Sequence, residues 1–226
     1  MQRLWPTPRT QRHVRPEPAA VPTPEQGAQL EAYLALLQRW NATYNLTSVR
    51  DAEAMRVQHL ADCLAVVEPL RRVCPAGRVL DVGSGGGLPG VVLAVMNPAW
   101  TVVCVDTVGK KAAFVRQVAA ELGLANLHAE HSRVESLRAP AFDVVTARAF
   151  ASLADIARLT GGLLSPAGCW MAMKGQRPAD EIAALPPDID VFHVEPLTIP
   201  GLDAQRCLVW MRYAPDHPRA SATASP

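Results

Sequence analysis

The stretch DVGSGGG, residues 81–87, decides the fold of this chain. It follows the short, mostly apolar run RVL at residues 78–80 and precedes a second apolar run that begins at residue 88. Glycines permit positive φ angles and let backbone N–H groups come close to a ligand. The stretch therefore predicts a buried strand, a glycine-rich turn and then a helix, an arrangement that holds a nucleoside-bearing cofactor.

The acid at the start of this stretch discriminates between two kinds of cofactor. Asp81 lies two residues before Gly83, where a carboxylate would repel the pyrophosphate of a dinucleotide. S-adenosyl-L-methionine (SAM) instead brings an amino acid with an ammonium group, which a nearby carboxylate attracts. The stretch therefore favours a SAM-dependent methyltransferase over a dehydrogenase.

A dinucleotide-binding motif is the alternative interpretation of the same glycines. The sequence GGGLPG at residues 85–90 satisfies G-x-G-x-x-G, and Asp106 lies 19 residues after Gly87, near the usual place of a ribose-binding acid. In that register, however, the first glycine falls two residues after Gly83, which is late for the strand-to-helix turn. An NAD-dependent dehydrogenase remains a distant alternative.

Composition limits the kind of protein. The 226 residues suit one domain of ordinary size with flanking pieces, and no apolar run is long enough to span a membrane. The formal net charge is only +1, so any nucleic-acid site must be a local patch. The five cysteines form no C-x-x-C pair, and we expect reduced, buried thiols in a cytoplasmic protein.

The ends of the chain differ from its centre. Residues 1–24 hold six prolines and four arginines with little apolar content, so we expect a disordered tail, with a weak RNA-contacting arm as the alternative. We expect residues 214–226 to be a similar disordered tail. Residues 25–75 predict a helical cap, with helices over 25–40, where Thr23 is the candidate N-cap, and over 52–67.

Strands and helices alternate through residues 76–213. We expect a Rossmann-like α/β domain, with a doubly wound and mostly parallel sheet that binds the cofactor beyond the carboxyl ends of its strands. The predicted strands are 79–82, 101–106, 126–130, 142–146, 169–174, 190–195 and 207–213, and the predicted helices are 88–96, 110–122, 153–164 and 178–185.

Candidate site residues fall at or just past the predicted strand ends. Asp106 could accept both ribose hydroxyls of an adenosine, or could instead cap the helix that follows. Glu130 and Glu135 follow the third strand, where the adenine edge is usually read, although Glu135 could equally be a solvated acid at a helix start. Arg148 follows the fourth strand and could meet a carboxylate or phosphate bidentately, or form a structural salt bridge. A basic rim could include Lys110, Lys111, Arg133, Lys174 and Arg177, although each alone is more typical of an ordinary surface charge.

Histidines offer two weaker signals. His59 and Asp62 are neighbours on one helix flank, and a hydrogen-bonded packing network is favoured slightly over substrate contact. His128 and His131 resemble a metal pair only superficially, because they span a strand end, and we expect no metal.

Several motifs in order resemble the GidB (RsmG) family, SAM-dependent methyltransferases that modify N7 of a guanine in bacterial 16S rRNA. The resemblance covers roughly residues 25–213. It is carried by the motifs NLT (45–47), HLAD (59–62), DVGSGGGLPG (81–90), DTVGKK (106–111), SRVE (132–135), RAFASL (148–153) and MKG (173–175). Two departures are minor: Gly86 occupies a variable loop position, and Thr107 stands where many relatives have serine.

The resemblance implies a set of cofactor contacts. SAM would be bound by residues of several motifs, namely Gly83 and Leu88 in the glycine loop, Asp106 at the ribose, Val134 and Glu135 at the adenine, and Arg148 completing the pocket. No catalytic residue is expected, because guanine N7 carries a lone pair and no proton.

The implied partner is 16S rRNA or the small ribosomal subunit, and the protein is expected to be a monomer. Arg133, Arg148 and Lys174 are candidates for phosphate or base contacts. Two alternatives remain, a small-molecule SAM-dependent methyltransferase and a non-catalytic rRNA-binding assembly protein.

Overall fold

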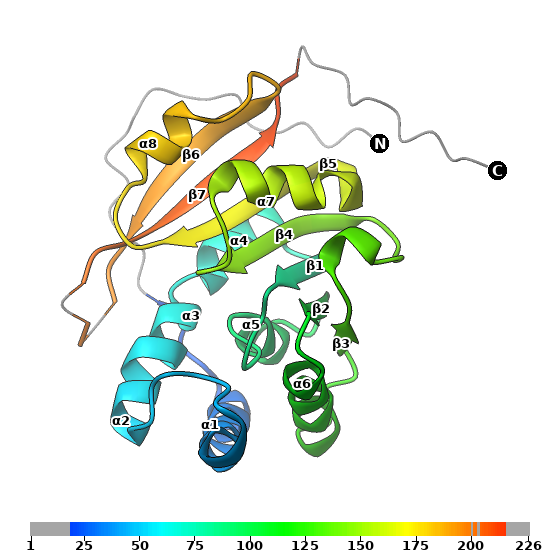
Figure 1. The fold of residues 1–226 in the computed structure, drawn as a ribbon. Helices are drawn as coiled ribbons and strands as arrows, with labels where there is room; N and C mark the ends of the chain where they lie inside the picture. Colours follow the sequence, from blue (N-terminus) through cyan, green and yellow to red (C-terminus); the bar gives the residue numbers. More distant parts are fainter. Residues whose placement is uncertain (1–18, 200, 203, 216–226) are drawn as a thin grey trace.

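A seven-stranded sheet forms the centre of the computed structural model, which describes residues 19–199, 201–202 and 204–215. The strand order is β3-β2-β1-β4-β5-β7-β6 (Figure 1). The first five of these run parallel, and β7 is antiparallel to both β5 and β6. The predicted α/β fold with a mostly parallel sheet is confirmed. The strands are β1 (Gly77–Val82), β2 (Trp100–Asp106), β3 (Leu127–His131), β4 (Phe142–Arg148), β5 (Leu164–Lys174), β6 (Ile189–Leu197) and β7 (Arg206–Tyr213).

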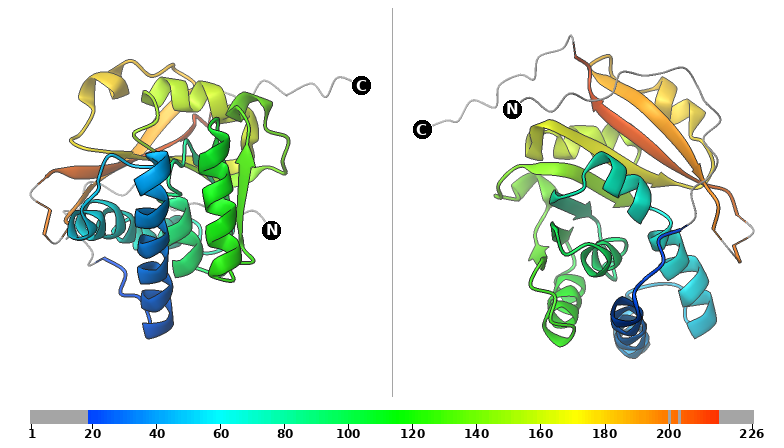
Figure 2. Two further views of the ribbon diagram at one scale, coloured as in Figure 1. Left: turned by 60° about the horizontal axis from the view of Figure 1, so that its bottom comes forward. Right: turned by 180° about the vertical axis from the view of Figure 1, so that it is seen from behind.

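Helices cover both faces of the sheet. Helix α1 packs against α5 and α6 on one face, and α7 and α8 lie on the other (Figures 1 and 2). The helices are α1 (Pro24–Tyr44), α2 (Ala52–Met55), α3 (Asp62–Leu64), α4 (Val67–Val73), α5 (Gly90–Met96), α6 (Gly109–Glu121), α7 (Leu153–Thr160) and α8 (Ala179–Ala183), with short turns η1 (Arg56–Ala61), η2 (Val134–Ser136) and η3 (Gly161–Leu163).

The sheet has a hydrophobic core on each side, because a doubly covered strand buries both of its faces. Val79 of β1 belongs to the core beneath α1, α5 and α6, whereas the next residue, Leu80, belongs to the core beneath α7. The four residues 79–82 are all buried. The run of apolar residues before the glycine loop is therefore explained by burial on both sides.

The helical cap begins earlier than composition suggests. Thr23 caps α1 through a capping box with Gln26, as its sequence position predicts, and Ala20 is already buried in the core. Ordered packing therefore starts before residue 25. Residues 1–18 and 216–226 of the two predicted tails lie outside the described residues.

Two predicted helices differ in the structure. The helix expected over 52–67 is divided, because the π-helical turn η1 interrupts it between α2 and α3. The helix expected over 153–164 ends at Thr160, where Gly161 and Gly162 weaken the helix and a 3-10 turn follows. Strand β5 consequently begins at Leu164 rather than at residue 169.

Other sequence expectations can be compared with the described residues. All five cysteines are buried free thiols, as predicted. Within the described ranges, no group of histidine, cysteine and acidic side chains could hold a metal ion, and no helix is long and apolar enough to cross a membrane.

Candidate functional site

The carboxyl ends of three neighbouring strands bring the predicted residues to one edge of the sheet. Val82 is in register with Val105 of β2 and with Ala147 of β4. The next residue along the chain is therefore Gly83, Asp106 or Arg148, and these three lie side by side at the carboxyl ends of the strands. This edge is where open α/β sheets bind ligands.

Asp81 is a fully buried carboxyl group with one free oxygen. Its Oδ2 accepts a hydrogen bond from the Gly90 N–H at 2.8 Å, and the Cys104 thiol lies 3.9 Å away. Its Oδ1 is buried with no hydrogen-bond partner in the structure. Burial raises the pKa of Asp81 to about 7, although the Gly90 N–H acts in the opposite direction. A cationic group that reached Oδ1 would satisfy it and favour its ionised form.

At two positions of the loop, neighbouring atoms leave no room for a residue larger than glycine. Gly83 has φ +66°, and a Cβ there would lie 2.5 Å from the Phe150 ring. Gly90 opens α5, and a Cβ there would lie 2.3 Å from the Cys104 sulfur and 2.9 Å from Asp81 Oδ2. The loop therefore turns sharply at its start and brings α5 close to β1 at its end.

The helical cap supports the glycine loop from outside the sheet. The buried Tyr33 hydroxyl on α1 donates to the Gly86 carbonyl oxygen at 2.6 Å. A Cβ on Gly86 would lie 2.9 Å from a Leu37 methyl group, so α1 packs directly on the loop. Sequence reasoning missed this contact, since a tyrosine among leucines on a helix resembles an ordinary core residue.

Asp106 accepts two backbone hydrogen bonds and remains able to bind a ligand. Its Oδ1 accepts from the Val108 N–H at 2.9 Å, next to the start of α6, and its Oδ2 accepts from the Gly85 N–H at 3.0 Å. Lys111 lies 3.8 Å away. A carboxylate has about four acceptor positions, so these bonds leave room for ribose hydroxyls. Val108 is itself the N-cap residue of α6, and no side chain caps this helix, so the alternative capping role of Asp106 is not observed. Its role at the ribose stays a prediction.

Three further residues predicted to contact the cofactor, Val134, Glu135 and Leu88, differ in burial. Val134 is buried in η2, and Glu135 beside it is exposed. Since Asp106 is in register with His131, this turn follows β3 at the same edge of the sheet. The Leu88 side chain is buried in the core, and its N–H donates to the Ser84 carbonyl oxygen at 3.0 Å.

Arg148 forms a structural salt bridge, the alternative role that its place in the sequence allowed. Its guanidinium lies 3.3 Å from Asp62 Oδ2 and 3.4 Å from the Gln58 carbonyl oxygen. Asp62 Oδ1 accepts from Arg206 at 3.0 Å. The buried Asp62 thus joins the cap to β4 and β7. The signal in the sequence was the spacing of His59 and Asp62 on one helix flank, but nothing there pointed to Arg206.

His59 belongs to the same region of the cap. Its Nε2 lies 2.7 Å from the Thr47 hydroxyl. Burial, and after it the positive charge of Arg148, lower the pKa of His59. His59 and Asp62 therefore take part in hydrogen-bonded packing, the interpretation that the sequence slightly favoured.

Some side chains of the predicted basic rim are engaged in contacts within the protein. Lys174 donates to both Glu181 oxygens, at 3.0 and 2.8 Å, and to the Ala151 carbonyl oxygen at 3.0 Å. Lys110 lies over the Tyr44 ring, 5.8 Å from its centroid. Arg133 and Arg177 are exposed. Lys174 therefore holds the segment after β4 in place, whereas Arg133 and Lys110 remain accessible at the rim.

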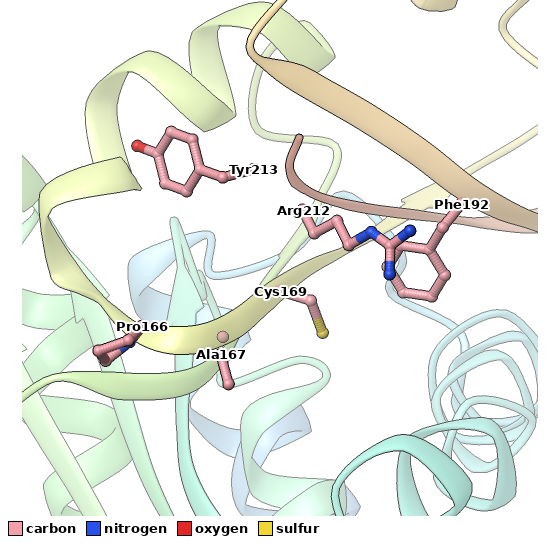
Figure 3. Close-up of a pocket in the computed structure, with 7 residues that line it drawn as sticks. Pro166, Ala167, Cys169, Phe192, Arg212 and Tyr213 are labelled. Atoms are coloured by element: carbon pink, nitrogen blue, oxygen red, sulfur yellow. The ribbon is translucent and has the colours of Figure 1, made fainter. Parts of the chain in front are cut away.

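A separate pocket of about 260 Å³ lies at the opposite edge of the sheet (Figure 3). Its lining includes Cys169 at the amino-terminal part of β5 and Tyr213 at the end of β7. Cys169 is in register with Val144, four residues before Arg148. The pocket is therefore distinct from the glycine loop.

The strand order, the glycine-rich turn after β1 and the acid at the end of β2 define a Rossmann-like methyltransferase. In its fold, the structure is similar to ribosomal protein L11 methylase from Lactobacillus delbrueckii subsp. bulgaricus, with a TM-score of 0.54. That pair is 17% identical over 69% of this chain and 78% of the other.

The sequence identifies the family within that class. Residues 26–209 match the GidB family, described as rRNA small subunit methyltransferase G, and the chain belongs to this family. It is 63% identical to ribosomal RNA small subunit methyltransferase G of Leptothrix cholodnii, over 83% of this chain and 87% of the relative. The protein of that name from Methylibium petroleiphilum is 60% identical over 84% and 86%. The predicted family and enzyme class are confirmed.

Proposed function

We propose that this protein transfers the methyl group of SAM to N7 of a guanine in 16S rRNA. The observation that carries the proposal is membership in the GidB family over residues 26–209. The relatives named above are called ribosomal RNA small subunit methyltransferase G and cover most of this chain. The geometry of the site and the chemistry of guanine support the cofactor and the reacting atom.

The residues at the sheet edge fit SAM. The unpartnered Oδ1 of Asp81 suits an ammonium group, which would satisfy a buried oxygen that otherwise has no partner. Asp106 keeps acceptor capacity for ribose hydroxyls, and the turn at Val134 and Glu135 follows the neighbouring strand. Gly83, Leu88 and Arg148 complete the set implied by the family motifs.

Methyl transfer to guanine N7 requires little of the protein beyond alignment of the two reactants. When bound, SAM supplies a methyl group on a positively charged sulfur, which a lone pair can attack directly. Guanine N7 has that lone pair and no proton, so no general base is required. Asp81 accepts from the Gly90 N–H and Asp106 from the Gly85 and Val108 N–H groups, and the acceptor positions that remain on both would hold the cofactor. These residues therefore bind and orient, and alignment supplies the rate acceleration.

The acceptor must present the Hoogsteen edge of its base. N7 lies in the deep and narrow major groove of A-form RNA, which side chains cannot enter. The target guanine is therefore expected in a loop, or unstacked on binding. We expect the protein to act in the cytoplasm as a monomer, either on naked 16S rRNA or on the small subunit.

A transfer assay with labelled SAM tests the proposal. The acceptors are naked 16S rRNA and 30S particles from a strain that lacks this protein. The expected result is incorporation of one methyl group per acceptor in at least one of the two. SAM binding without label in either RNA acceptor would overturn the proposal and would redirect the search to small-molecule acceptors.

A further inference from the structure

Phe150 presents an aromatic ring at the edge of the sheet that holds the glycine loop. Among the described residues, the exposed large hydrophobic side chains are Val21, Tyr44 and Phe150, and Phe150 is 38% exposed. Exposure of an aromatic ring forfeits the free energy of burying it. Single exposed apolar residues are ordinary, so the significance of Phe150 depends on its position.

The backbone around Phe150 is strained and anchored. Ala149 adopts φ +52°, a left-handed conformation that costs a residue with a Cβ about 1–3 kcal/mol. Arg148 before it is held by Asp62, and the Ala151 carbonyl oxygen after it is held by Lys174. Ser152 then caps α7 through the Asp155 N–H. The ring is therefore carried on a short turn that is fixed on both sides.

The ring lies against the start of the glycine loop. A Cβ on Gly83 would lie 2.5 Å from Cδ2 of Phe150, so the ring is in van der Waals contact with Gly83 itself. Strand β1 lies between β2 and β4 in the sheet. The ribose acid Asp106 ends β2, on one side of Gly83, whereas Phe150 follows β4, on the other side. A methyl acceptor has to approach from the side that adenosine does not occupy.

We propose that Phe150 is the stacking surface for the guanine that receives the methyl group. Bases stack readily on exposed aromatic rings, and an unstacked guanine needs a new partner for its face. A ring fixed next to Gly83 would hold the purine plane in one orientation, with its N7 edge turned toward the bound cofactor. This assignment rests on the proposed function and adds the residue that positions the substrate.

Two substitutions separate stacking from other roles of the side chain. Phe150→Leu removes the ring and keeps apolar bulk, and Phe150→Tyr keeps the ring. We expect Phe150→Leu to lower kcat/KM for the rRNA acceptor roughly 10- to 100-fold, the range for loss of one base–aromatic contact. Phe150→Tyr should remain within about threefold of the wild type, since it stacks equally well. Calorimetry without RNA should give SAM dissociation constants within about twofold for all three proteins.

Tyr44→Leu is the matched control. Tyr44 has a similar exposure of 40%, but its ring packs on Trp40, with centroids 5.2 Å apart. Its loss should change kcat/KM much less than the loss of Phe150. Thermal unfolding of each variant checks that the fold is retained, which is expected at exposed positions.

The possible outcomes are distinct. If Phe150→Leu is as active as the wild type, or no worse than Tyr44→Leu, the ring is not the guanine platform. If Phe150→Leu loses SAM affinity as strongly as it loses activity, the ring belongs to the cofactor pocket instead. A wild-type protein that methylates neither naked rRNA nor 30S particles would overturn the proposed function, and this assignment with it.

Discussion

The N–H of Gly90 donates to Oδ2 of Asp81 at 2.8 Å and leaves Oδ1 of the same buried carboxyl group without a partner. The two residues belong to α5 and β1, which the glycine loop connects. Burial raises the pKa of Asp81 to about 7. The free protein therefore holds, at the end of β1, an acid that ionises near neutral pH and that a cationic ligand would stabilise as the carboxylate.

The first prediction concerns the pH dependence of cofactor binding. The ammonium group of SAM prefers ionised Asp81, so affinity should fall as the pH drops below about 7, by up to about tenfold per pH unit. Asp81→Asn should bind more weakly at about pH 7.5 and should show little change between about pH 5.5 and 7.5. Isothermal titration calorimetry of both proteins measures this. Equal pH profiles would show that Asp81 does not receive the ammonium group.

The second prediction concerns stability without ligand. The pKa of Asp81 is raised from 3.8 to about 7 in the folded protein, so its contribution to stability is present below about pH 4 and is lost as the pH rises through 7. An asparagine does not titrate, so Asp81→Asn removes this pH-dependent loss of stability. The free energy of unfolding of the variant, relative to the wild type, should therefore increase by a few kcal/mol between about pH 4 and pH 8. Urea denaturation at several pH values tests this, and a difference that does not vary with pH would contradict it.

The third prediction compares one substitution at two glycines. Gly90→Ala should destabilise the protein by about 1–3 kcal/mol, since its Cβ would collide with the Cys104 sulfur and with Asp81. Gly27→Ala in α1 meets no atom within 4 Å and should stabilise by about 0.5–1 kcal/mol through helix propensity. Chemical denaturation of both variants gives the two values. A Gly90→Ala variant that is as stable as the wild type would refute the close packing of α5 on the sheet.

The fourth prediction concerns the cap. Asp62→Asn leaves Arg148 and Arg206 without their shared carboxylate, so it should cost about 3–5 kcal/mol of unfolding free energy. The control is Glu31→Gln, which removes an exposed ion pair with Arg56 and should cost under about 1 kcal/mol. Denaturation curves provide both numbers. Similar small losses would mean that Asp62 does not join the cap to the sheet.

Local patterns are enough to predict the sheet and the edge that holds the site. Strand ends and glycines are encoded by neighbouring residues, so the amino-acid sequence alone places Asp81, Gly83 and Asp106 together. Alternation of strands and helices then requires a parallel sheet. Thr23 is likewise recognisable as a helix cap from its own neighbourhood.

Contacts between distant segments cannot be predicted in this way. Asp62 and Arg206 are 144 residues apart, and only the folded sheet brings them together. The bond from Tyr33 to Gly86 likewise depends on how α1 packs. The π-helical turn η1 interrupts a segment whose apolar spacing suits a continuous helix. Phe150 is visible in the sequence only as part of a motif, because its contact with Gly83 depends on the backbone conformation of the preceding alanine.

The most direct measurement compares 16S rRNA from cells with and without this protein, mapped by strand cleavage specific for N7-methylated guanine. We expect one cleavage position that is present with the wild-type protein, absent without it, and restored by the wild type but not by Asp81→Asn. Identical cleavage patterns in the presence and absence of the protein would contradict guanine-N7 methylation of 16S rRNA as its function.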